Sequence, residues 1–364
     1  MTDDPRSELQ SLRERIDRCD RELLRLLAER ARVALEIGHI KQAHGLPIYD
    51  PERERSVLDA LAALNDGPLS DQAVRLIFQQ VIRACRNLEQ PPRIAFLGPC
   101  NTFSHQAVLD YFGPEVELAP QAEFADVAEA VARGEVEAGV LPVENALEGF
   151  IGTTFDLVVE HELQVVGEVI VPVELYLLSN VENLEDVRVV YSHAQPLRQA
   201  RQWLRAHLNG VPLVTVESTA AAAERAASEQ GAAAIAGPLV VAAARLPVLA
   251  GPVEDRADNR TRFWVVGREP AGQGDKTALM LVLPHEPGSL ARALQVFAEY
   301  ELNLTQIDSR PARSRPWEYR FFVEMQGNAQ GERESAALQA LQQSGVHARI
   351  LGVFSAAAGV GDDV

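Results

Sequence analysis

The sequence predicts a multidomain protein with three modules: an all-α module at residues 1–90, a two-lobed α/β module at 92–269 and an α+β module at 276–355. Two breaks support this division. Pro91-Pro92 follows a helical pattern, and the stretch 270–275 is rich in Gly and Pro, as flexible linkers are. Across these breaks the hydrophobic period changes from that of helices to that of short strands. With 364 residues, the chain is long enough for more than one core.

The composition is that of an ordinary globular protein. Hydrophobic residues make up 47% of the chain, charged residues 24%, and the formal net charge is −18. This acidic balance argues against nucleic acid and anionic membranes as partners, because both require a basic face. The three cysteines lack the spacing of zinc sites or disulfides, and no apolar run is long enough to span a bilayer. We therefore expect a cytoplasmic protein without a metal ion.

The first module predicts one long and two shorter helices. Residues 7–42 contain no Pro and a single Gly, so they can form a helix roughly 50 Å long. Asp50-Pro51 is a typical helix start, and Ser70 can cap a third helix. The first helix is too long for a compact module of 90 residues. We therefore expect an intertwined homodimer, or a higher homo-oligomer, that buries the excess length.

Basic residues lie within the apolar repeat of the long helix. The heptad ladder, in steps of four and three, is Leu9, Arg13, Ile16, Asp20, Leu23, Leu27, Arg30, Ala34, Ile37 and Lys41. One such cation could extend past the apolar stripe into solvent. Three buried cations need countercharges, and Asp20 is the only acid on the ladder. The ladder therefore predicts a bound anion with more than one carboxylate.

The third predicted helix carries an acid on its apolar face. Phe78, Ile82, Cys85 and Glu89 follow one another at helical spacing. As the last residue before the proline break, Glu89 could extend into solvent. Alternatively, it is a desolvated and partly protonated acid that faces the same ligand.

Four motifs of this module resemble the all-helical chorismate mutases: Leu12-Arg13-Glu14, Leu27-Ala28-Glu29-Arg30, Gly38 through Lys41, and Asp50-Pro51-Glu52-Arg53-Glu54. The resemblance implies the pericyclic rearrangement of chorismate to prephenate, which needs no nucleophile. By resemblance, Arg30 and the partner subunit's Arg13 bind carboxylates, and Lys41 donates to the ether oxygen. Asp50 and Glu54 contact the substrate hydroxyl, with Arg53 nearby. Cys85 and Glu89 stand where the best-known bacterial members have Ser and Gln.

Glu89 leads to a prediction about pH. A Gln amide can donate to the ether oxygen at any pH, whereas a carboxyl group can donate only when protonated. We expect mutase activity to fall as the pH rises through an elevated pKa of Glu89, and the substitution Glu89→Gln to extend activity to higher pH. A pH–rate profile of the wild type that stays flat from mildly acidic to alkaline conditions would contradict this.

The middle module alternates strand-like runs with alanine-rich helical stretches, which predicts an α/β sheet. The expected strands are 94–97, 138–143, 165–171, 187–191, 213–216, 233–236 and 263–266. Polar stretches at 98–105, 142–149, 191–196 and 259–263 lie at or beside strand ends, where α/β proteins place their ligands. Taken singly, each stretch could equally be a capped turn.

Together these stretches resemble the prephenate dehydratases, most clearly in Thr261-Arg262-Phe263 and in Glu144-Asn145 followed by Glu148-Gly149. The resemblance implies two lobes around a cleft and conversion of prephenate to phenylpyruvate with loss of water and CO₂. It makes Thr261 the catalytic hydroxyl. The substrate contacts that it suggests are Thr102, Ser104, Asn145, Ser218, Thr219, Arg262 and Phe263; a structural ion pair is equally possible for Arg262. Asn101 stands where the family usually has Gly, and Ala146 replaces a small hydroxyl residue.

The last module predicts the order βαββαβ, with strands at 277–283, 304–309, 319–325 and 348–354 and helices at 289–300 and 332–343. Its motifs Pro287-Gly288-Ser289-Leu290 and Asp308-Ser309-Arg310-Pro311 resemble the ACT domain, of ferredoxin-like fold, in phenylalanine-regulated dehydratases. The resemblance implies that phenylalanine binds between two such modules as an effector. The residues implied are Gly288, Ser289, Leu290, Ser309, Arg310 and Pro311.

The combined resemblance is to bifunctional chorismate mutase–prephenate dehydratases of phenylalanine biosynthesis under feedback inhibition by phenylalanine. These reactions imply chorismate and prephenate as substrates and no cofactor. Two alternatives stay open: a non-catalytic aromatic amino-acid sensor, and a dehydratase whose mutase site has decayed. A sensor needs neither the cations of the ladder nor Thr261, so these residues favour an enzyme over a non-catalytic sensor.

Overall fold

The computed structural model describes residues 5–44, 51–89, 91–311 and 319–357. Its contacts divide the chain into two compact units, one of residues 1–92 with 115–117 and one of the remaining residues. Among the described helices, none combines the length and apolar character that a membrane span requires.

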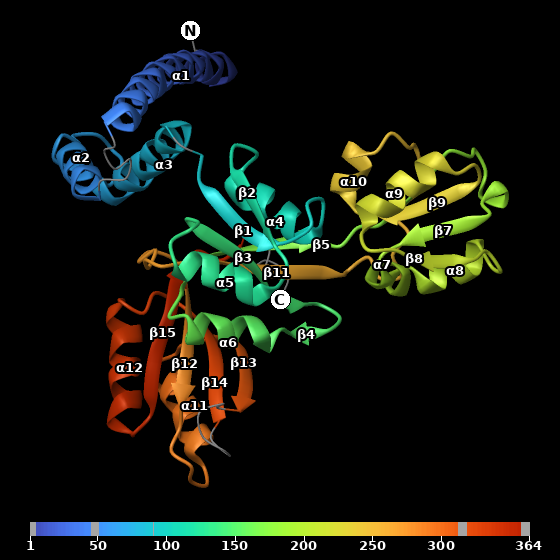
Figure 1. The fold of residues 1–364 in the computed structure, drawn as a ribbon. Helices are drawn as coiled ribbons and strands as arrows, with labels where there is room; N and C mark the ends of the chain where they lie inside the picture. Colours follow the sequence, from blue (N-terminus) through green and yellow to red (C-terminus); the bar gives the residue numbers. More distant parts are fainter. Residues whose placement is uncertain (1–4, 45–50, 90, 312–318, 358–364) are drawn as a thin grey trace. The chain divides into compact units, whose positions relative to one another are not determined.

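The described part of residues 1–89 in the first unit is all-helical, as predicted (Figure 1). It comprises α1 (Pro5–His44), α2 (Pro51–Ala63) and α3 (Asp71–Glu89). The Ser70 hydroxyl accepts a hydrogen bond from the amide of Ala73 at 3.2 Å, which is the expected N-cap of α3. α3 packs against both other helices. With 40 residues, α1 is roughly 60 Å long and extends far beyond what two shorter helices can cover.

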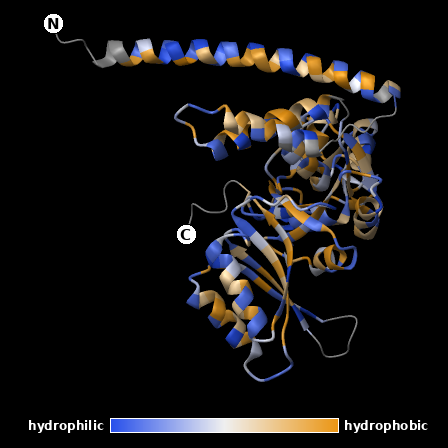
Figure 2. Ribbon diagram, turned by 90° about the vertical axis from the view of Figure 1, so that its left-hand side faces the viewer, coloured by the Kyte–Doolittle hydropathy of each residue, from blue (hydrophilic) through white to orange (hydrophobic). Residues whose placement is uncertain are grey.

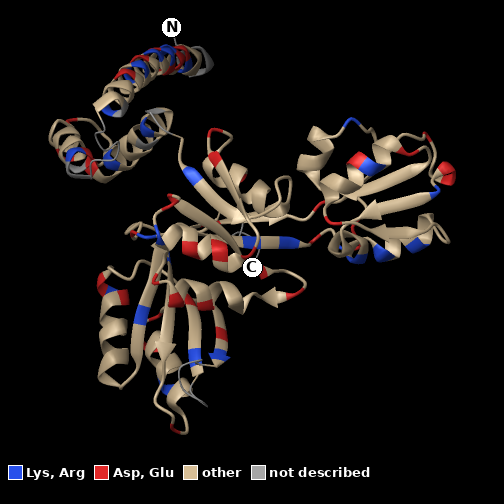
Figure 3. Cartoon of the chain, in the orientation of Figure 1, with Lys and Arg blue, Asp and Glu red and all other residues tan. Residues whose placement is uncertain are grey.

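Most of the ladder on α1 is therefore exposed in the single chain, which differs from the buried seam that the periodicity predicts. Ala34 is the ladder residue that is buried, whereas Ile16 and Leu23 are 60% and 56% exposed. Figure 2 shows hydrophobic residues along the whole helix, and Figure 3 shows basic and acidic residues interspersed with them. The helical period identifies an apolar stripe, but a single protomer does not supply the surface that covers it.

The second unit begins with a lobe built on a mixed sheet of strand order β2-β1-β3-β11-β5, with β4 paired to β3. β11 lies between β3 and β5 and is antiparallel to both. The elements are β1 (Arg93–Leu97), α4 (Phe103–Phe112), β2 (Glu117–Gln121), α5 (Phe124–Ala132), β3 (Ala138–Asn145), β4 (Gly149–Phe150), α6 (Gly152–Glu160), β5 (Gln164–Pro172) and β11 (Arg260–Gly267).

A second lobe is inserted between β5 and β11, so the chain crosses between the lobes twice. Its sheet has the order β10-β6-β9-β7-β8. The elements are β6 (Tyr176–Ser179), a 3₁₀ turn (Leu184–Asp186), β7 (Val189–Ser192), α7 (Ala194–Gln199), α8 (Arg201–His207), β8 (Leu213–Thr215), α9 (Thr219–Ser228), β9 (Ala232–Ala236), α10 (Pro238–Ala243) and β10 (Val248–Ala250). All seven strands predicted for the two lobes are present; the short strands β2, β4, β6 and β10 were not predicted.

The C-terminal elements confirm the βαββαβ order. They are β12 (Lys276–Val282), α11 (Ser289–Glu299), β13 (Leu304–Pro311), β14 (Tyr319–Gln326), α12 (Glu332–Gln343) and β15 (His347–Phe354). The antiparallel sheet has the order β13-β14-β12-β15. A core of its own forms under α11 and α12, with Phe297 and Leu341 fully buried.

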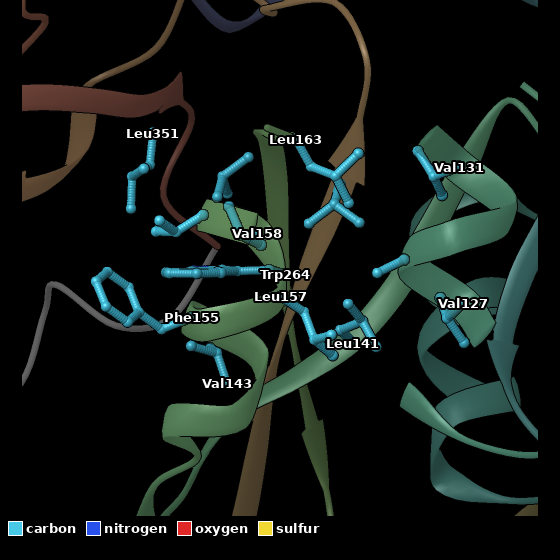
Figure 4. Packing of buried hydrophobic residues seen from close by; sticks show 14 of the residues in the cluster. Val127, Val131, Leu141, Val143, Phe155, Leu157, Val158, Leu163, Trp264 and Leu351 are labelled. Atoms are coloured by element: carbon cyan, nitrogen blue, oxygen red, sulfur yellow. The ribbon is translucent and has the colours of Figure 1, made fainter. Parts of the chain in front are cut away.

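The other face of this C-terminal sheet shares a core with the first lobe. Trp264 of β11 and Phe155 of α6 belong to the same buried cluster as Phe322 of β14 and Leu351 of β15. The Trp264 and Phe322 rings meet edge to face, with centroids 5.2 Å apart. Figure 4 shows Trp264, Phe155 and Leu351 gathered in this core. Because the core is continuous, the C-terminal sheet and the first lobe form one packed body.

Candidate active sites

The predicted mutase residues lie along all three helices of the first unit. Arg13 is exposed on α1, Arg30 and Lys41 are half-buried further along the helix, and Arg53 is exposed on α2. Cys85 is buried on α3. Asp50 and the side chain of Glu89 lie outside the described residues.

Two of the predicted residues, Arg30 of α1 and Glu54 of α2, form hydrogen bonds with residues of α3. The Arg30 guanidinium donates to the carbonyl of Val81 at 3.4 Å, one helical turn before Cys85. Glu54 accepts from Arg86 Nη1 at 2.6 Å, and the two side chains are similarly half-buried. Arg30 therefore belongs to the contact between α1 and α3. Glu54 is paired with Arg86, a cation outside the predicted site residues.

A cavity of about 590 Å³ lies between the two lobes of the second unit. The predicted residues that line it are Thr102, Ser104, Asn145, Ser218, Thr219, Thr261 and Phe263. They come from α4 and its cap, the end of β3, the start of α9, and β11. The polar stretches at the strand ends therefore meet in one cleft, although its predicted lining residues are up to 161 residues apart in sequence (from 102 to 263).

Asn145 and Thr261 form a hydrogen-bonded pair in this cleft. They are register partners on β3 and β11, and the Asn145 amide donates to the Thr261 hydroxyl oxygen at 2.9 Å. The Asn145 carbonyl oxygen accepts from the backbone amides of Leu147 and Glu148, at 3.0 and 3.2 Å. These bonds fix the orientation of the Asn145 amide. Because the Thr261 oxygen accepts from Asn145, its proton can be donated to a ligand in the cleft.

Two helices of ten residues begin at the cleft. The Thr102 hydroxyl accepts from the amide of His105 at 3.3 Å and caps α4, and the Ser218 hydroxyl accepts from Ala221 at 3.0 Å and caps α9. Both hydroxyl oxygens thus act as N-caps of helices. The partial positive charge of these helix starts favours anions in the cleft.

The loop before α4 takes the backbone angle expected of Asn101, with φ at 66°. The Asn101 amide donates to Nδ1 of His105 at 3.0 Å. Burial lowers the pKa of His105, which keeps the imidazole neutral and able to accept this bond. His105 therefore stabilises the left-handed turn at the edge of the cleft.

Several residues that line the cleft were not predicted as site residues. They include Phe103, Glu148, His193, Gln195 and Glu217. The polar stretch 191–196 pointed to His193 and Gln195, but the sequence offered no signal for Glu217. The described lining contains no Lys or Arg. Helix starts and neutral donors, rather than basic side chains, are therefore what the described lining offers to an anion.

Arg262 does not line the cleft; its guanidinium is buried in a charge cluster on the opposite side of β11. Its nearest carboxylate oxygens belong to Glu324 at 2.7 Å, Glu168 at 2.9 Å and Glu144 at 3.0 Å. Lys276 completes the cluster, with its Nζ 2.7 Å from Glu168. Of the two roles left open for Arg262, this geometry supports the structural ion pair.

The charges in this cluster stabilise one another. Burial disfavours the charged form of Glu168, but Lys276 and Arg262 outweigh it and hold the pKa of this carboxyl below its usual range. Burial also disfavours the charged form of Arg262, yet Glu324 and Glu168 raise its pKa. The stability that Glu168 contributes is therefore present above the ordinary pKa of glutamate and is lost as the pH falls through its lowered value.

The predicted regulatory residues divide between two places. Ser289 and Leu290 line a cavity of about 170 Å³ together with Leu283 and Phe321. Gly288, in the left-handed conformation with φ at 81°, is the N-cap of α11. Ser309, Arg310 and Pro311 lie on β13, and Arg310 Nη2 donates to Asp156 of α6 at 2.9 Å.

Comparisons with known proteins follow the same three-part division. Family models match at residues 12–90 (chorismate mutase type II), 94–271 (prephenate dehydratase) and 277–343 (ACT domain). A bifunctional chorismate mutase/prephenate dehydratase of Aquifex aeolicus is 40% identical over 95% of this chain and 98% of its own length. The chain belongs to the bifunctional chorismate mutase/prephenate dehydratase family.

Another bifunctional enzyme and a solved prephenate dehydratase structure are also similar to this chain. A bifunctional chorismate mutase/prephenate dehydratase of Pseudomonas aeruginosa is 38% identical and covers 95% of this chain and 97% of its own. The crystal structure of an Arthrobacter aurescens prephenate dehydratase in complex with L-Phe is 32% identical, with a TM-score of 0.64 over 72% of this chain and 90% of that chain. The prephenate dehydratase model thus covers the two-lobed part of the chain, and the ACT model covers most of the C-terminal βαββαβ module.

Proposed function

We propose that the chain converts chorismate to prephenate in its helical unit, and prephenate to phenylpyruvate, water and CO₂ in the two-lobed cleft. The observation that carries the second activity is the Thr261 hydroxyl, held by Asn145 at 2.9 Å on the wall of a cavity of about 590 Å³. Membership in the bifunctional family supports both activities.

The dehydration requires that prephenate lose its ring carboxylate and its ring hydroxyl together. The electron pair of the breaking C–CO₂ bond moves into the ring and expels the ring hydroxyl, and the departing hydroxide takes up a proton from the solvent to leave as water. Thr261 donates a hydrogen bond to the departing oxygen, where negative charge develops. The starts of α4 and α9 attract the substrate carboxylates. Aromatisation of the ring supplies the driving force, so the protein mainly positions prephenate and polarises the bond to its departing hydroxyl.

The dehydratase proposal is tested by supplying prephenate to the purified chain at neutral pH and following phenylpyruvate. We expect turnover far above the uncatalysed rate. Binding of prephenate without turnover would instead favour the alternative of a non-catalytic sensor.

In the helical unit, we propose that Arg30 and the partner subunit's Arg13 bind the substrate carboxylates. Lys41 donates to the ether oxygen as its C–O bond breaks. Asp50, Arg53, Glu54, Cys85 and Glu89 complete this proposed set. The contact of Arg30 with Val81, one turn before Cys85, supports a common site on α1 and α3. Arg13 and Arg30 lie on α1 and are separated by 17 residues in sequence. This separation supports the proposal that Arg13 contributes to the site of a different subunit.

We also propose that the helical unit forms a homodimer through α1. Leu9, Ile16, Leu23 and Leu24 are 54–68% exposed in the single chain, which is an unusual apolar surface for a monomer. We expect light scattering of the full chain to give at least twice the protomer mass of 39.8 kDa. Replacing Ile16 and Leu23 by glutamate should shift the mass towards the protomer and reduce mutase activity. A wild-type mass of one protomer would contradict the proposal.

Phenylalanine is the proposed effector of the C-terminal module. The Arthrobacter relative in complex with L-Phe supports this, as does the cavity at Ser289 and Leu290. We expect phenylalanine to bind the full chain and to inhibit the dehydratase reaction, because it favours a less active state. Calorimetry and initial rates, with L-tyrosine as the comparison ligand, measure this. Unchanged rates at saturating phenylalanine would contradict it. The cytoplasmic location and the module limits 1–90, 92–269 and 276–355 remain predictions.

A further inference from the structure

β11 presents alternate residues to two different neighbours, as a strand does. Thr261 and Phe263 line the cleft. Arg262 and Trp264 contact the C-terminal sheet instead, Arg262 through Glu324 and Trp264 through Phe322. A single strand therefore separates the proposed catalytic hydroxyl from the proposed regulatory module.

The Arg262 guanidinium reaches two strands of the C-terminal sheet. Its Nη1 donates to Glu324 Oε1 of β14 at 2.7 Å, and its Nη2 donates to Gln306 Oε1 of β13. The side chains of Arg262 and Glu324 are 9% and 1% exposed. Water therefore screens this contact little, and the charge-assisted bonds are strong.

The same guanidinium is bound to the sheet of the first lobe. Its Nη1 donates to Glu168 of β5 at 2.9 Å, and its Nε and Nη2 donate to Glu144 of β3 at 3.1 and 3.0 Å. Glu144 is the register partner of Arg262, and the next pair along β3 and β11 is Asn145 with Thr261. A shift of Arg262 therefore moves the strands at the position that carries the catalytic hydroxyl.

The cluster resists partial separation. Lys276 of β12 lies 2.7 Å from Glu168 and 3.8 Å from Glu324, so both cations contact both buried carboxylates. Removing one partner would leave a buried charge uncompensated, which is strongly destabilising. A movement of the C-terminal sheet against the first lobe must therefore either carry β11 with it or break the whole cluster.

We propose that Arg262 is a positioning residue, which holds the Thr261–Asn145 pair in place through its attachment to Glu324 and Gln306 of the C-terminal sheet. Movements of that sheet thereby act on the dehydration. This inference rests on the proposed dehydratase function of the cleft.

The test compares Glu324→Gln with wild type in the full chain. We expect the dehydratase kcat to fall about 10-fold with KM within about twofold, because the hydroxyl is misplaced while the substrate contacts remain. Phenylalanine should still bind with a Kd within about threefold, but its inhibition of kcat should weaken at least about fivefold. Gln306→Ala, which leaves no unpaired charge, should change the same quantities in the same direction by about threefold.

Glu334→Gln is the matched control. Glu334 is a buried glutamate of α12 in the same module, and its charge partner is Arg333 rather than a residue of β11. It should leave kcat and the inhibition unchanged. The proposal is overturned if folded Glu324→Gln and Gln306→Ala both behave as wild type, or if Glu334→Gln causes equal losses.

The outcomes also separate this inference from the proposed function. If wild type does not convert prephenate, the dehydratase function itself is wrong. If wild type converts prephenate but does not respond to phenylalanine, the effector proposal is wrong, and the kcat of Glu324→Gln still decides whether Arg262 positions Thr261.

Discussion

Thr261→Ala is expected to lower the dehydratase kcat by about 10²–10³-fold, the loss typical of removing one donor that stabilises developing charge. KM should change little, because the two helix starts that are proposed to bind the carboxylates do not depend on this hydroxyl. With chorismate as substrate, this variant should accumulate prephenate. Initial rates with prephenate and a time course with chorismate measure the two effects.

Thr261→Ser keeps the hydroxyl and should restore most of the activity. Thr153→Ala removes an exposed threonine hydroxyl from α6 and should have no effect. If Thr261→Ala retained full kcat, or if Thr261→Ser were as inactive as Thr261→Ala, the hydroxyl would not be the catalytic group.

Lys41→Ala is expected to lower mutase activity by about 10³-fold or more, since the proposed charge-assisted donor to the ether oxygen is lost. The variant should leave chorismate largely unconverted but still dehydrate supplied prephenate at the wild-type rate. The two measurements in one preparation separate loss of catalysis from loss of folding.

Arg25→Ala is the control on the same helix. Arg25 is paired with Glu22 at 2.8 Å and with Glu29 at 3.2 Å, and all three side chains are exposed. It is expected to retain mutase activity within about twofold, because exposed ion pairs contribute little. Equal losses in Lys41→Ala and Arg25→Ala would indicate damage to α1 rather than removal of a catalytic donor.

The sequence predicted the three fold types because each rests on local pattern. The helical repeat of residues 7–42 has no Pro, and it forms α1 as expected. Even the alanine-rich β9 was predicted as a strand. The missed strands are short or weakly patterned: β4 has two residues, and β2 contains a proline within Glu117–Gln121. Pairing with a neighbour, rather than their own sequence, defines such strands.

The cleft was largely predictable because its polar residues lie at the ends of strands and the starts of helices. The partners of Arg262 in its structural ion pair were not, because Glu144, Glu168 and Glu324 are 62 to 118 residues away in sequence. Periodicity likewise marked the ladder on α1 as buried, although the single chain leaves most of it exposed. Local pattern shows that a face must be covered, but not by which surface.

The most direct test of the central claim is a time course with chorismate as the only substrate. With the purified wild-type chain, prephenate and phenylpyruvate are followed separately. We expect chorismate to disappear, prephenate to appear first and phenylpyruvate to follow as the final product. Chorismate that stays unconverted, or prephenate that accumulates without phenylpyruvate, would contradict the assignment of both activities to this chain.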